Sequence, residues 1–364
     1  MSRIDDLIAE LCPNGVEYKA LGSIARIKNG KDHKSLGEGD IPVYGSGGVM
    51  RYVDNYVYDK PSVLIPRKGS LGNLFYVDVP FWNVDTIFYT EINESLACPK
   101  FLYYFLTTVG LGEMNNAGGV PSQTQSVLNK IQIPIPPLEI QREIVKVLDT
   151  FTKLEAELEA ELEARRRQYH YYRDQLLNFE GRDDVQWMTL GEVTKINTGQ
   201  KPSNILEVAT DFEYINAGTS RSGYCVASNC EGDTVTTPSR GQGGIGYVGY
   251  QKKTFWLGPL CYKLQSLDND ILINKYLFYV LQSKNELLLG LKKEGGVPAV
   301  NKSDIIKLEI PVPPLEEQTR IVTILDKFDA LVNDLSCGLP AEIAARRKQY
   351  AYYRDRLLTF KEAQ

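Results

Sequence analysis

The stretch Ile133–Phe179, IPIPPLEIQREIVKVLDTFTKLEAELEAELEARRRQYHYYRDQLLNF, has a second copy at Ile310–Phe360, IPVPPLEEQTRIVTILDKFDALVNDLSCGLPAEIAARRKQYAYYRDRLLTF. Each copy opens with a Pro-Pro pair, at Pro136-Pro137 and Pro313-Pro314. Prolines cannot donate backbone hydrogen bonds and hold the chain extended, so we expect a long helix to begin directly after each pair. A duplication of this length sets the organisation of the whole chain.

In both copies apolar residues recur at steps of three and four, which predicts an apolar stripe along one helix face. The expected coiled-coil seam consists of Ile144, Val147, Phe151, Leu154, Leu158, Ile321, Ile324, Phe328, Leu331 and Leu335. A helix of about 40 residues, at ~1.5 Å each, forms a rod on the order of 60 Å long. The second copy carries four extra residues around Gly338 and Pro340, where we expect the helix to break.

The segments before each long helix also resemble one another. IPRKGSLG at Ile65–Gly72 aligns with TPSRGQGG at Thr237–Gly244, and GGVP at 118–121 aligns with GGVP at 295–298. Both segments contain short β-like runs between Gly-rich turns. The predicted strands are 62–65, 74–77, 86–89, 211–216, 246–250 and 260–264, and the predicted helices that follow are 100–109 and 274–283.

The first residues suggest a cyclic arrangement. A helix is expected at 2–11, and GVEYKALG at Gly15–Gly22 resembles DVQWMTLG at Asp184–Gly191. This register places Asp5 on Asp174, so the N-terminus is expected to repeat the tail of the central helix. The expected fold is α+β: two mixed α/β domains separated by two long antiparallel helices with pseudo-twofold symmetry. The expected boundaries are 1–17 (N-terminal helix), 18–137 (first domain), 138–180 (central helix), 181–312 (second domain) and 313–364 (C-terminal helix).

The sequence offers little catalytic material. It contains 2 histidines and 6 scattered cysteines, so we expect neither a metal site nor imidazole catalysis. Gly241–Gly246 fits G-x-G-x-x-G, but Tyr247–Tyr250 after it reads as strand or turn, whereas a dinucleotide site needs a helix there. No Walker A loop is present. We therefore expect a non-catalytic binding protein, and the lack of a signal-like start or a long apolar run suggests a cytoplasmic one.

Loops rich in Gly, Lys, Arg, Asn and Ser recur in both repeats and can contact phosphates and base edges of DNA. The matched Arg67-Lys68-Gly69 and Arg240-Gly241 segments carry this prediction most strongly; ordinary solvated loop charges are the alternative for any single residue. The candidate DNA-binding residues are Lys31, Lys34, Tyr44, Ser46, Arg67, Lys68, Ser70, Asn73, Lys201, Asn216, Arg221, Arg240, Gln242 and Lys252. The Arg165–Arg167 and Arg346–Lys348 clusters are assigned to i,i+4 ion pairs on the helices, with contact to a partner protein as the alternative. The helix tyrosines are assigned to helix packing rather than to base stacking.

The paired IPIPPLEIQ and IPVPPLEEQ segments, the paired ARRRQYHYYRDQLLNF and ARRKQYAYYRDRLLTF helix ends, and the Leu21-Gly22 and Leu190-Gly191 openings resemble the DNA-specificity subunits of type I restriction–modification systems. The resemblance spans essentially the whole chain. It implies two target-recognition domains held by conserved spacer helices. It also implies no catalysis and no cofactor in this chain, because S-adenosylmethionine and ATP with Mg²⁺ serve the partner subunits.

The resemblance implies double-stranded DNA, two modification (methyltransferase) subunits and restriction subunits as partners. We expect each domain to read one half of an asymmetric, bipartite target, with the helices setting a gap near one duplex turn, ~34 Å. A net charge of −5 predicts weak DNA binding by the isolated chain. The alternative is a coiled-coil interaction scaffold carrying two β domains that bind protein or carbohydrate.

Overall fold

The computed structural model describes residues 2–114, 122–241, 243–293 and 297–363. The chain divides into two compact units. Unit 1 comprises Met1–Leu158 and Ile343–Gln364, and unit 2 comprises Glu159–Glu342. Unit 1 therefore combines the first repeat with the last part of the chain, as a cyclic arrangement requires.

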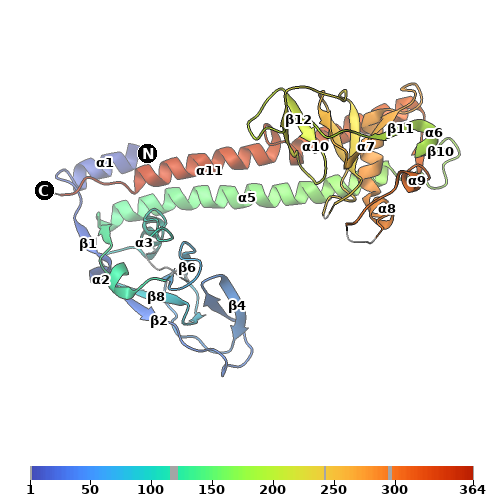
Figure 1. Ribbon diagram of the computed structural model, residues 1–364. Coiled ribbons are helices and arrows are strands. Elements are labelled where there is room, and N and C mark those ends of the chain that lie inside the picture. The colour runs from blue at the N-terminus through green and yellow to red at the C-terminus, as the bar shows by residue number, and fades with distance from the viewer. Residues whose placement is uncertain (1, 115–121, 242, 294–296, 364) are drawn as a thin grey trace. The chain divides into compact units, whose positions relative to one another are not determined.

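The globular part of unit 1 contains two small sheets and a two-stranded pair (Figure 1). The four-stranded sheet has the order β2 (Ala25–Asn29), β8 (Ile87–Ile92), β5 (Ser62–Pro66), β6 (Phe75–Val77). The three-stranded sheet has the order β4 (Gly48–Val53), β3 (Ile41–Gly45), β7 (Trp82–Asn83). The remaining pair joins β1 (Tyr18–Ala20) to β9 (Gln132–Pro134) in antiparallel register.

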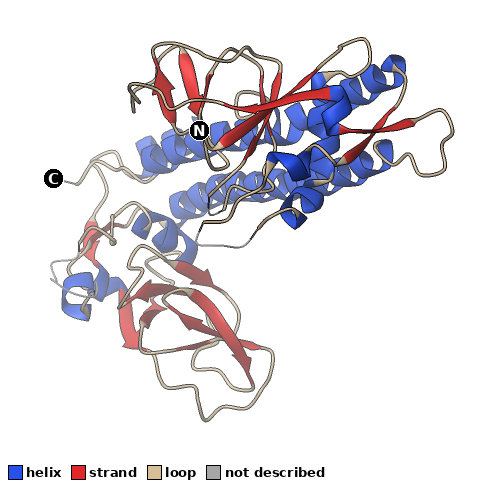
Figure 2. Ribbon diagram, turned by 45° about the vertical axis from the view of Figure 1, so that its right-hand side comes forward, coloured by secondary structure: helices blue, strands red, loops and turns tan. Residues whose placement is uncertain are grey.

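Unit 2 repeats this topology strand for strand. Figure 2 shows the strands of both globular parts in red. Its four-stranded sheet has the order β11 (Thr194–Thr198), β17 (Cys261–Ser266), β14 (Thr234–Pro238), β15 (Gly249–Gln251). Its three-stranded sheet has the order β13 (Gly223–Cys225), β12 (Phe212–Ile215), β16 (Trp256–Leu257). The antiparallel pair joins β10 (Gln186–Thr189) to β18 (Glu309–Val312). Two mixed repeats alternating with long helices confirm the predicted fold class.

Short helices complete each globular part, and long helices follow. Unit 1 contains α1 (Ser2–Leu11), α2 (Leu21–Ile24), α3 (Pro99–Leu106) and α4 (Gln125–Leu128). Unit 2 contains α6 (Leu190–Val193), α7 (Asn274–Ser283), α8 (Asn285–Gly290), α9 (Lys302–Ile305) and α10 (Leu315–Asn333). Two helices contribute to both units: α5 (Leu138–Leu176) and α11 (Gly338–Leu357).

The central strand of each four-stranded sheet is fully buried, but the two strands achieve burial with different residues. β5 has the sequence SVLIP, an apolar run typical of a strand covered on both faces. β14 has the sequence TVTTP, and its threonines are buried because their hydroxyls bond to carbonyls. Thr234 Oγ1 donates to Glu231 O at 2.9 Å, and Thr237 Oγ1 donates to Tyr247 O at 2.9 Å. The hydrophobic pattern therefore identified β5 and missed β14.

Matched aromatic stacks join the long helices within each unit. In unit 1, Phe151 of α5 stacks on Tyr353 of α11, with ring centroids 5.5 Å apart and planes at 27°. In unit 2, Phe328 of α10 stacks on Tyr172 of α5 at 5.8 Å and 28°. Glu155 follows Phe151 in α5, whereas its partner Arg347 precedes Tyr353 in α11. Because this ion pair is 2.6 Å long, α5 and α11 run antiparallel within unit 1. These tyrosines pack between helices, as predicted.

The seam otherwise follows the prediction only in part. Its most buried residues are Ile140, Ile144 and Leu148 in α5 and Ile321, Leu325 and Val332 in α10. The predicted members Val147, Phe328 and Leu331 are half-buried and pack against these cores, and Phe151, Leu158 and Ile324 are half-buried. Leu154 and Leu335 are exposed, and Leu335 lies outside the helices. At Leu154 the predicted stripe drifts because a straight helix has 3.6 residues per turn, whereas the seam assumed 3.5. Leu335 is exposed because α10 ends at Asn333, before it.

The helix break in the second copy lies where the sequence predicted it. α10 ends at Asn333 and α11 begins at Gly338. Between them, the Asp334 carboxylate accepts hydrogen bonds from Ser336 N at 2.7 Å and from Ser336 Oγ at 2.6 Å. Gly338 has φ +79°, and a Cβ at this position would lie 2.4 Å from Ala330 O. Glycine at the break thus allows both the left-handed backbone and the close return to α10.

The C-terminal tail leads back to the first repeat. Val16 N donates to Lys361 O at 2.8 Å, and Ala363 N donates to Val16 O at 3.0 Å. α1 packs beside the end of α11, with Ile4 buried against Leu357 and Leu358 (Figure 1). The aromatic stack of α11 on α5 shows that α11, rather than α1, occupies in unit 1 the place of the α5 tail in unit 2. The predicted alignment of α1 with that tail therefore differs from the structure.

Both copies of the long helix begin with Pro-Pro-Leu-Glu followed two residues later by a glutamine, at Gln141 and Gln318. Both glutamines are buried. Gln141 Oε1 accepts from Cys98 N at 2.8 Å, and Gln141 Nε2 donates to Leu96 O at 2.9 Å and Pro136 O at 2.7 Å. Gln318 makes the same three bonds in unit 2, with Ile273 N, Ile271 O and Pro313 O, the longest at 2.9 Å. Each glutamine therefore connects the start of its long helix to the loop that precedes α3 in unit 1 or α7 in unit 2. We call α3 and α7 the domain helices.

The six cysteines are free thiols, of which Cys225, Cys230 and Cys261 are buried and Cys337 is exposed. Across 2–114, 122–241, 243–293 and 297–363, no helix combines the length and apolar character needed to cross a membrane.

Candidate nucleic-acid interface

Matched basic loops follow the central strands β5 and β14. The structure aligns Pro66 with Pro238, so Lys68 corresponds to Arg240. Each basic residue precedes a left-handed glycine, Gly69 at φ +81° and Gly241 at φ +123°. Both loops are anchored through backbone bridges, Lys68 to Ser122 and Arg240 to Ala299. Both basic side chains are exposed. This arrangement holds a cation on a rigid backbone at the same place in both domains.

In unit 1 several predicted residues gather around Thr86, just before β8. Ser46 N donates to Thr86 Oγ1 at 3.3 Å, and Asn73 Nδ2 donates to Ser46 O at 3.3 Å. Arg67 N and Lys68 N donate to Thr86 O at 2.8 and 3.2 Å. We call Ser46, Arg67, Lys68, Asn73 and Thr86 the Thr86 surface. It combines cations with amide and hydroxyl groups, which are the groups that contact phosphates and base edges.

Lys34 lies next to the Thr86 surface. It lines a hollow of about 420 Å³ together with His33, Met50 and Thr86. Ser70 is exposed in the same loop as Asn73, and Ser70 O accepts from Asn73 N at 3.0 Å. Lys34 and Ser70 therefore both border the Thr86 surface.

Two further predicted residues of unit 1, Tyr44 and Lys31, contact other parts of the domain. The Tyr44 ring lies 5.8 Å from Phe75 and 6.3 Å from Phe81, and burial raises the pKa of its hydroxyl. Lys31 is exposed, and its carbonyl accepts from Trp82 Nε1 at 3.1 Å. Tyr44 is therefore half-buried against the cluster that contains Leu64, Phe81 and Tyr89, and its assignment as a contact residue stays a prediction.

The predicted residues of unit 2 form a different surface. Arg221 stacks over the Tyr224 ring at 5.0 Å and lies 3.8 Å from Glu213. It lines a hollow of about 220 Å³, and Lys252 lines an adjoining hollow of about 430 Å³. Both hollows are bordered by Glu213, Tyr250 and Gln251. Carboxylates therefore accompany the cations at both surfaces, since Asp32 and Asp85 line the hollow beside Thr86; the two surfaces differ in their polar side chains.

The other predicted residues of unit 2 are not brought together with Arg221. Asn216 is structural: its Oδ1 accepts from Leu260 N at 2.9 Å. Lys201 is exposed in the loop after β11. Gln242, together with residues 118–121 and 295–296 of the paired GGVP segments, lies outside the described residues.

Sequence reasoning missed Thr86, Met50 and His33. Thr86 was assigned to a predicted strand at 86–89, but β8 begins at Ile87, which leaves the Thr86 hydroxyl available to Ser46. Met50 is 60% exposed. A prominent apolar side chain on β4 gives no signal in a hydrophobic pattern, which assigns such residues to a core.

The arginine clusters on α5 form helix ion pairs, as predicted. Arg165 binds Glu161 at 2.7 Å, and Arg167 binds Glu163 at 3.1 Å, both at i,i+4 spacing. Tyr171 and its counterpart Tyr352 are each 61% exposed. In the parts of the chain that the structure describes, no group of His, Cys, Asp and Glu could hold a metal ion.

The sequence matches the profile of the type I restriction modification DNA specificity domain at residues 13–164 and 182–345. A putative type I restriction enzyme specificity subunit of Haemophilus influenzae is 31% identical over 95% of this chain and 96% of its own. The EcoR124I/EcoR124II specificity subunit of Escherichia coli is 34% identical over 74% of this chain and 73% of its own. These relatives do not favour the scaffold alternative.

Solved structures support the same fold. A crystal structure of the S subunit of a type I restriction-modification system from M. genitalium superposes with a TM-score of 0.68. The two chains are 19% identical, and the match covers 94% of this chain and 96% of the other. The profile covers most of the chain, in two copies that coincide with the two repeats described above. The chain belongs to the family of type I restriction–modification DNA specificity subunits.

Proposed function

We propose that this chain reads two separated half-sites of one DNA duplex, one with each recognition domain, and so directs a type I restriction–modification complex to an asymmetric target. One observation carries this proposal. The two domains share strand order and the position of Lys68 and Arg240, whereas the residues around these cations differ. A common scaffold with different surfaces suits two readers of different sequences.

Within each domain the residues divide into two roles. Lys68 and Arg240 are suited to phosphates, because they are exposed cations on anchored loops. Ser46 and Asn73 of the Thr86 surface, and Arg221 with Gln251 in unit 2, are suited to base edges, because they present hydroxyl, amide and guanidinium donors. The other candidates stay predictions as DNA contacts: Lys31, Lys34, Tyr44, Arg67, Ser70, Lys201, Asn216, Gln242 and Lys252.

The long helices set the gap between the half-sites. α5 is one helix of 39 residues, ~60 Å long at ~1.5 Å per residue. A spacer of this kind, with one domain at each end of its sequence, suits half-sites about one duplex turn apart, ~34 Å. The gap is then a property of helix length, and the half-site sequences are properties of the domains.

The catalytic steps belong to other subunits. We place two modification subunits and, in the full complex, restriction subunits around this chain, with S-adenosylmethionine, ATP and Mg²⁺ bound by those partners and none by this chain. A complex that acts on cellular DNA places it in the cytoplasm. Because the net charge is −5, the isolated chain is expected to bind DNA weakly and with steep salt dependence.

The proposal is tested by selecting DNA with the purified complex of this chain and its modification subunits. Duplexes with a randomised stretch are incubated with the complex, and the retained molecules are sequenced. The expected result is one motif made of two unlike half-sites at a single spacing. A continuous motif, or a palindrome, would contradict the assignment of one half-site to each domain.

A further inference from the structure

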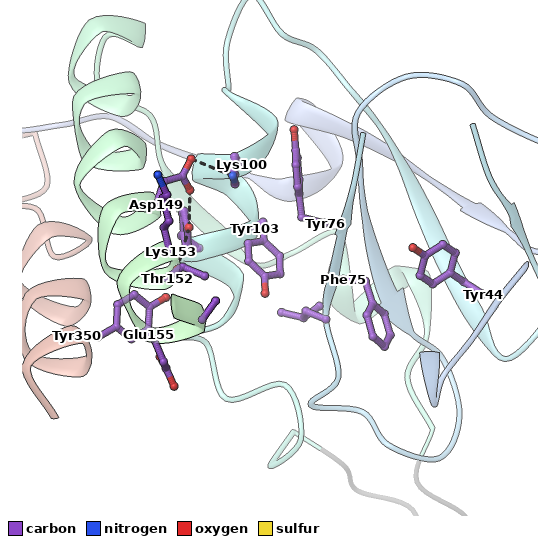
Figure 3. Close-up of a pocket in the computed structure, with 13 residues that line it drawn as sticks. Tyr44, Phe75, Tyr76, Lys100, Tyr103, Asp149, Thr152, Lys153, Glu155 and Tyr350 are labelled. Atoms are coloured by element: carbon purple, nitrogen blue, oxygen red, sulfur yellow. Dashed lines mark hydrogen bonds and ion pairs between the residues drawn. The ribbon is translucent and has the colours of Figure 1, made fainter. Parts of the chain in front are cut away.

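A Lys–Asp–Tyr cluster joins the first domain to its spacer helix (Figure 3). Asp149 of α5 accepts from Lys100 Nζ at 2.9 Å and from the Tyr104 hydroxyl at 2.6 Å. Lys100 and Tyr104 stand one turn apart on α3. The Lys100 ammonium also lies 5.4 Å from the centre of the Tyr76 ring on β6. One carboxylate and one ammonium therefore connect a strand of the sheet, the domain helix and the spacer helix.

The second domain repeats this cluster. Asp326 of α10 accepts from the Tyr279 hydroxyl at 2.5 Å and lies 3.4 Å from Lys275 Nζ. Lys275 and Tyr279 again stand one turn apart, now on α7. The Lys275 ammonium lies 4.3 Å from the centre of the Tyr250 ring on β15. We call the two sets, Lys100–Asp149–Tyr104 and Lys275–Asp326–Tyr279, the domain joints.

The joints are matched although the recognition surfaces are not. β6 and β15 occupy the same place in their sheets, as do α3 and α7 in their units, so the same three elements meet at each joint. By contrast, the Thr86 surface has no counterpart at Arg221. The shared parts of the two domains are thus those that face the spacer helices, which points to a role common to both readers.

The hydrogen bonds and ion pairs at the joints are directional, so they can fix the orientation of a domain on its helix, which apolar packing cannot do. The carboxylates are partly exposed, at 37% for Asp149 and 49% for Asp326, so these ion pairs contribute little to overall stability. Burial, with hydrogen bonds to the carboxylates, raises the pKa of Tyr104 and of Tyr279, so both hydroxyls remain donors. Apolar contact is non-directional, whereas bonds to one carboxylate from two residues fix an orientation.

The joint of unit 1 lies beside open space. A cavity of about 740 Å³ is lined by Tyr76 and Tyr103 of the domain and by Asp149, Thr152 and Lys153 of α5 (Figure 3). Close packing therefore does not fill this part of the boundary between domain and spacer helix. The joint supplies polar contacts between the domain and α5 beside this opening, whereas Phe101 and Tyr104 of α3 belong to one buried apolar cluster with Ile144 and Leu148 of α5. The joint therefore adds direction to a contact that the apolar cluster also holds.

We propose that the domain joints are positioning residues that fix the angle of each recognition domain on its spacer helix, and thereby the spacing at which the complex accepts two half-sites. This inference rests on the proposed function. It predicts that weakening a joint relaxes the required gap without changing the bases that either domain reads. A residue that reads bases, or one that only supports folding, would not have that effect.

The test is the selection described above, performed with the assembled complex carrying Asp149→Asn or, separately, Asp326→Asn. The variants are expected to retain both half-sites. Their preference for the wild-type gap over gaps one base pair shorter or longer is expected to fall by about tenfold, the scale of one hydrogen bond to a charged group. Asp149→Asn is expected to have the larger effect because of the cavity. Glu157→Gln, an exposed carboxylate on the same helix, is the matched control and is expected to leave the preference unchanged.

The outcomes separate the inference from the function. If the wild-type complex yields no split motif, the proposed function fails. If it yields one, and a folded Asp149→Asn complex keeps the full gap preference, the joint proposal is overturned. Equal loss of affinity at every gap, or altered half-site bases, would also overturn it. Should Asp149→Asn fail to fold, Tyr104→Phe removes a single hydroxyl and is judged by the same gap ratio.

Discussion

Single cations at matched positions are predicted to contribute measurably to DNA affinity. Lys68 is exposed, lies on a loop anchored to Ser122, and precedes a left-handed glycine. If it contacts a phosphate, Lys68→Ala should weaken binding of all sequences by about tenfold and reduce the salt slope by about one unit. The measurement is a titration of the complex with duplex DNA at several salt concentrations.

Lys60 provides the control for this prediction. It is exposed and precedes β5, whereas Lys68 follows the same strand, so the two lysines stand at opposite ends of it. Lys60→Ala should leave affinity and salt slope unchanged. Equal effects from both substitutions would mean that Lys68 acts only through the total charge of the domain.

Buried glutamines give a second prediction for single residues. Gln141 is fully buried and satisfies Cys98 N, Leu96 O and Pro136 O. Gln141→Leu leaves these groups without partners, so the free energy of unfolding should fall by about 2–4 kcal/mol. Urea unfolding of the chain measures it. Gln132→Leu removes an exposed glutamine and should change stability by less than about 0.5 kcal/mol; a comparable loss there would contradict the assigned role of Gln141.

At the level of single residues, the sequence predicted positions correctly where the neighbouring residues indicate the backbone conformation. The basic-glycine pairs at Lys68 and Arg240 follow aligned prolines, and the structure aligns them. The surroundings of Tyr44 and Asn216 could not be read from the sequence, because their contacts are with distant segments, at Phe81 and Leu260. Thr86 was missed for the same reason, since only the fold brings Ser46 and Asn73 to it.

At the scale of elements, stability is expected to depend on Gly338, the glycine at the break between α10 and α11. Gly338 has a left-handed backbone, and an added Cβ would lie 2.4 Å from Ala330 O. Gly338→Ala should therefore lower the free energy of unfolding by about 1–3 kcal/mol. Gly181 has a similar φ of +74° but nothing within 4 Å of the added Cβ, so Gly181→Ala should cost less. Thermal unfolding of both variants compares them, and an equal loss would show that strain alone, and not the contact, sets the cost.

Helices were predictable from sequence to a degree that strands were not. α1 and α7 have the predicted bounds, because the periodic apolar residues that indicate a helix lie close together in the sequence. β14 was missed because its threonines are buried through hydroxyl bonds with distant carbonyls. The pairing order of the strands could not be read at all, since it depends on contacts far apart in the chain.

At the scale of the whole molecule, the repeated sequence inside α5 permits a direct change of spacer length. Leu154–Ala164 reads LEAELEAELEA, so removing Leu158–Glu161 leaves the same sequence on either side of the join. Four residues make just over one helical turn, so the variant helix is shorter by ~6 Å and its apolar face is nearly preserved. The half-sites should then remain readable at a different spacing.

The most direct measurement is therefore DNA selection by the complex carrying this four-residue deletion, compared with the wild-type complex. The account predicts that both half-site sequences are unchanged and that the gap between them shortens by about one or two base pairs. An unchanged gap, or a new sequence in either half-site, would contradict the claim that helix length sets the spacing and that each domain reads its own half.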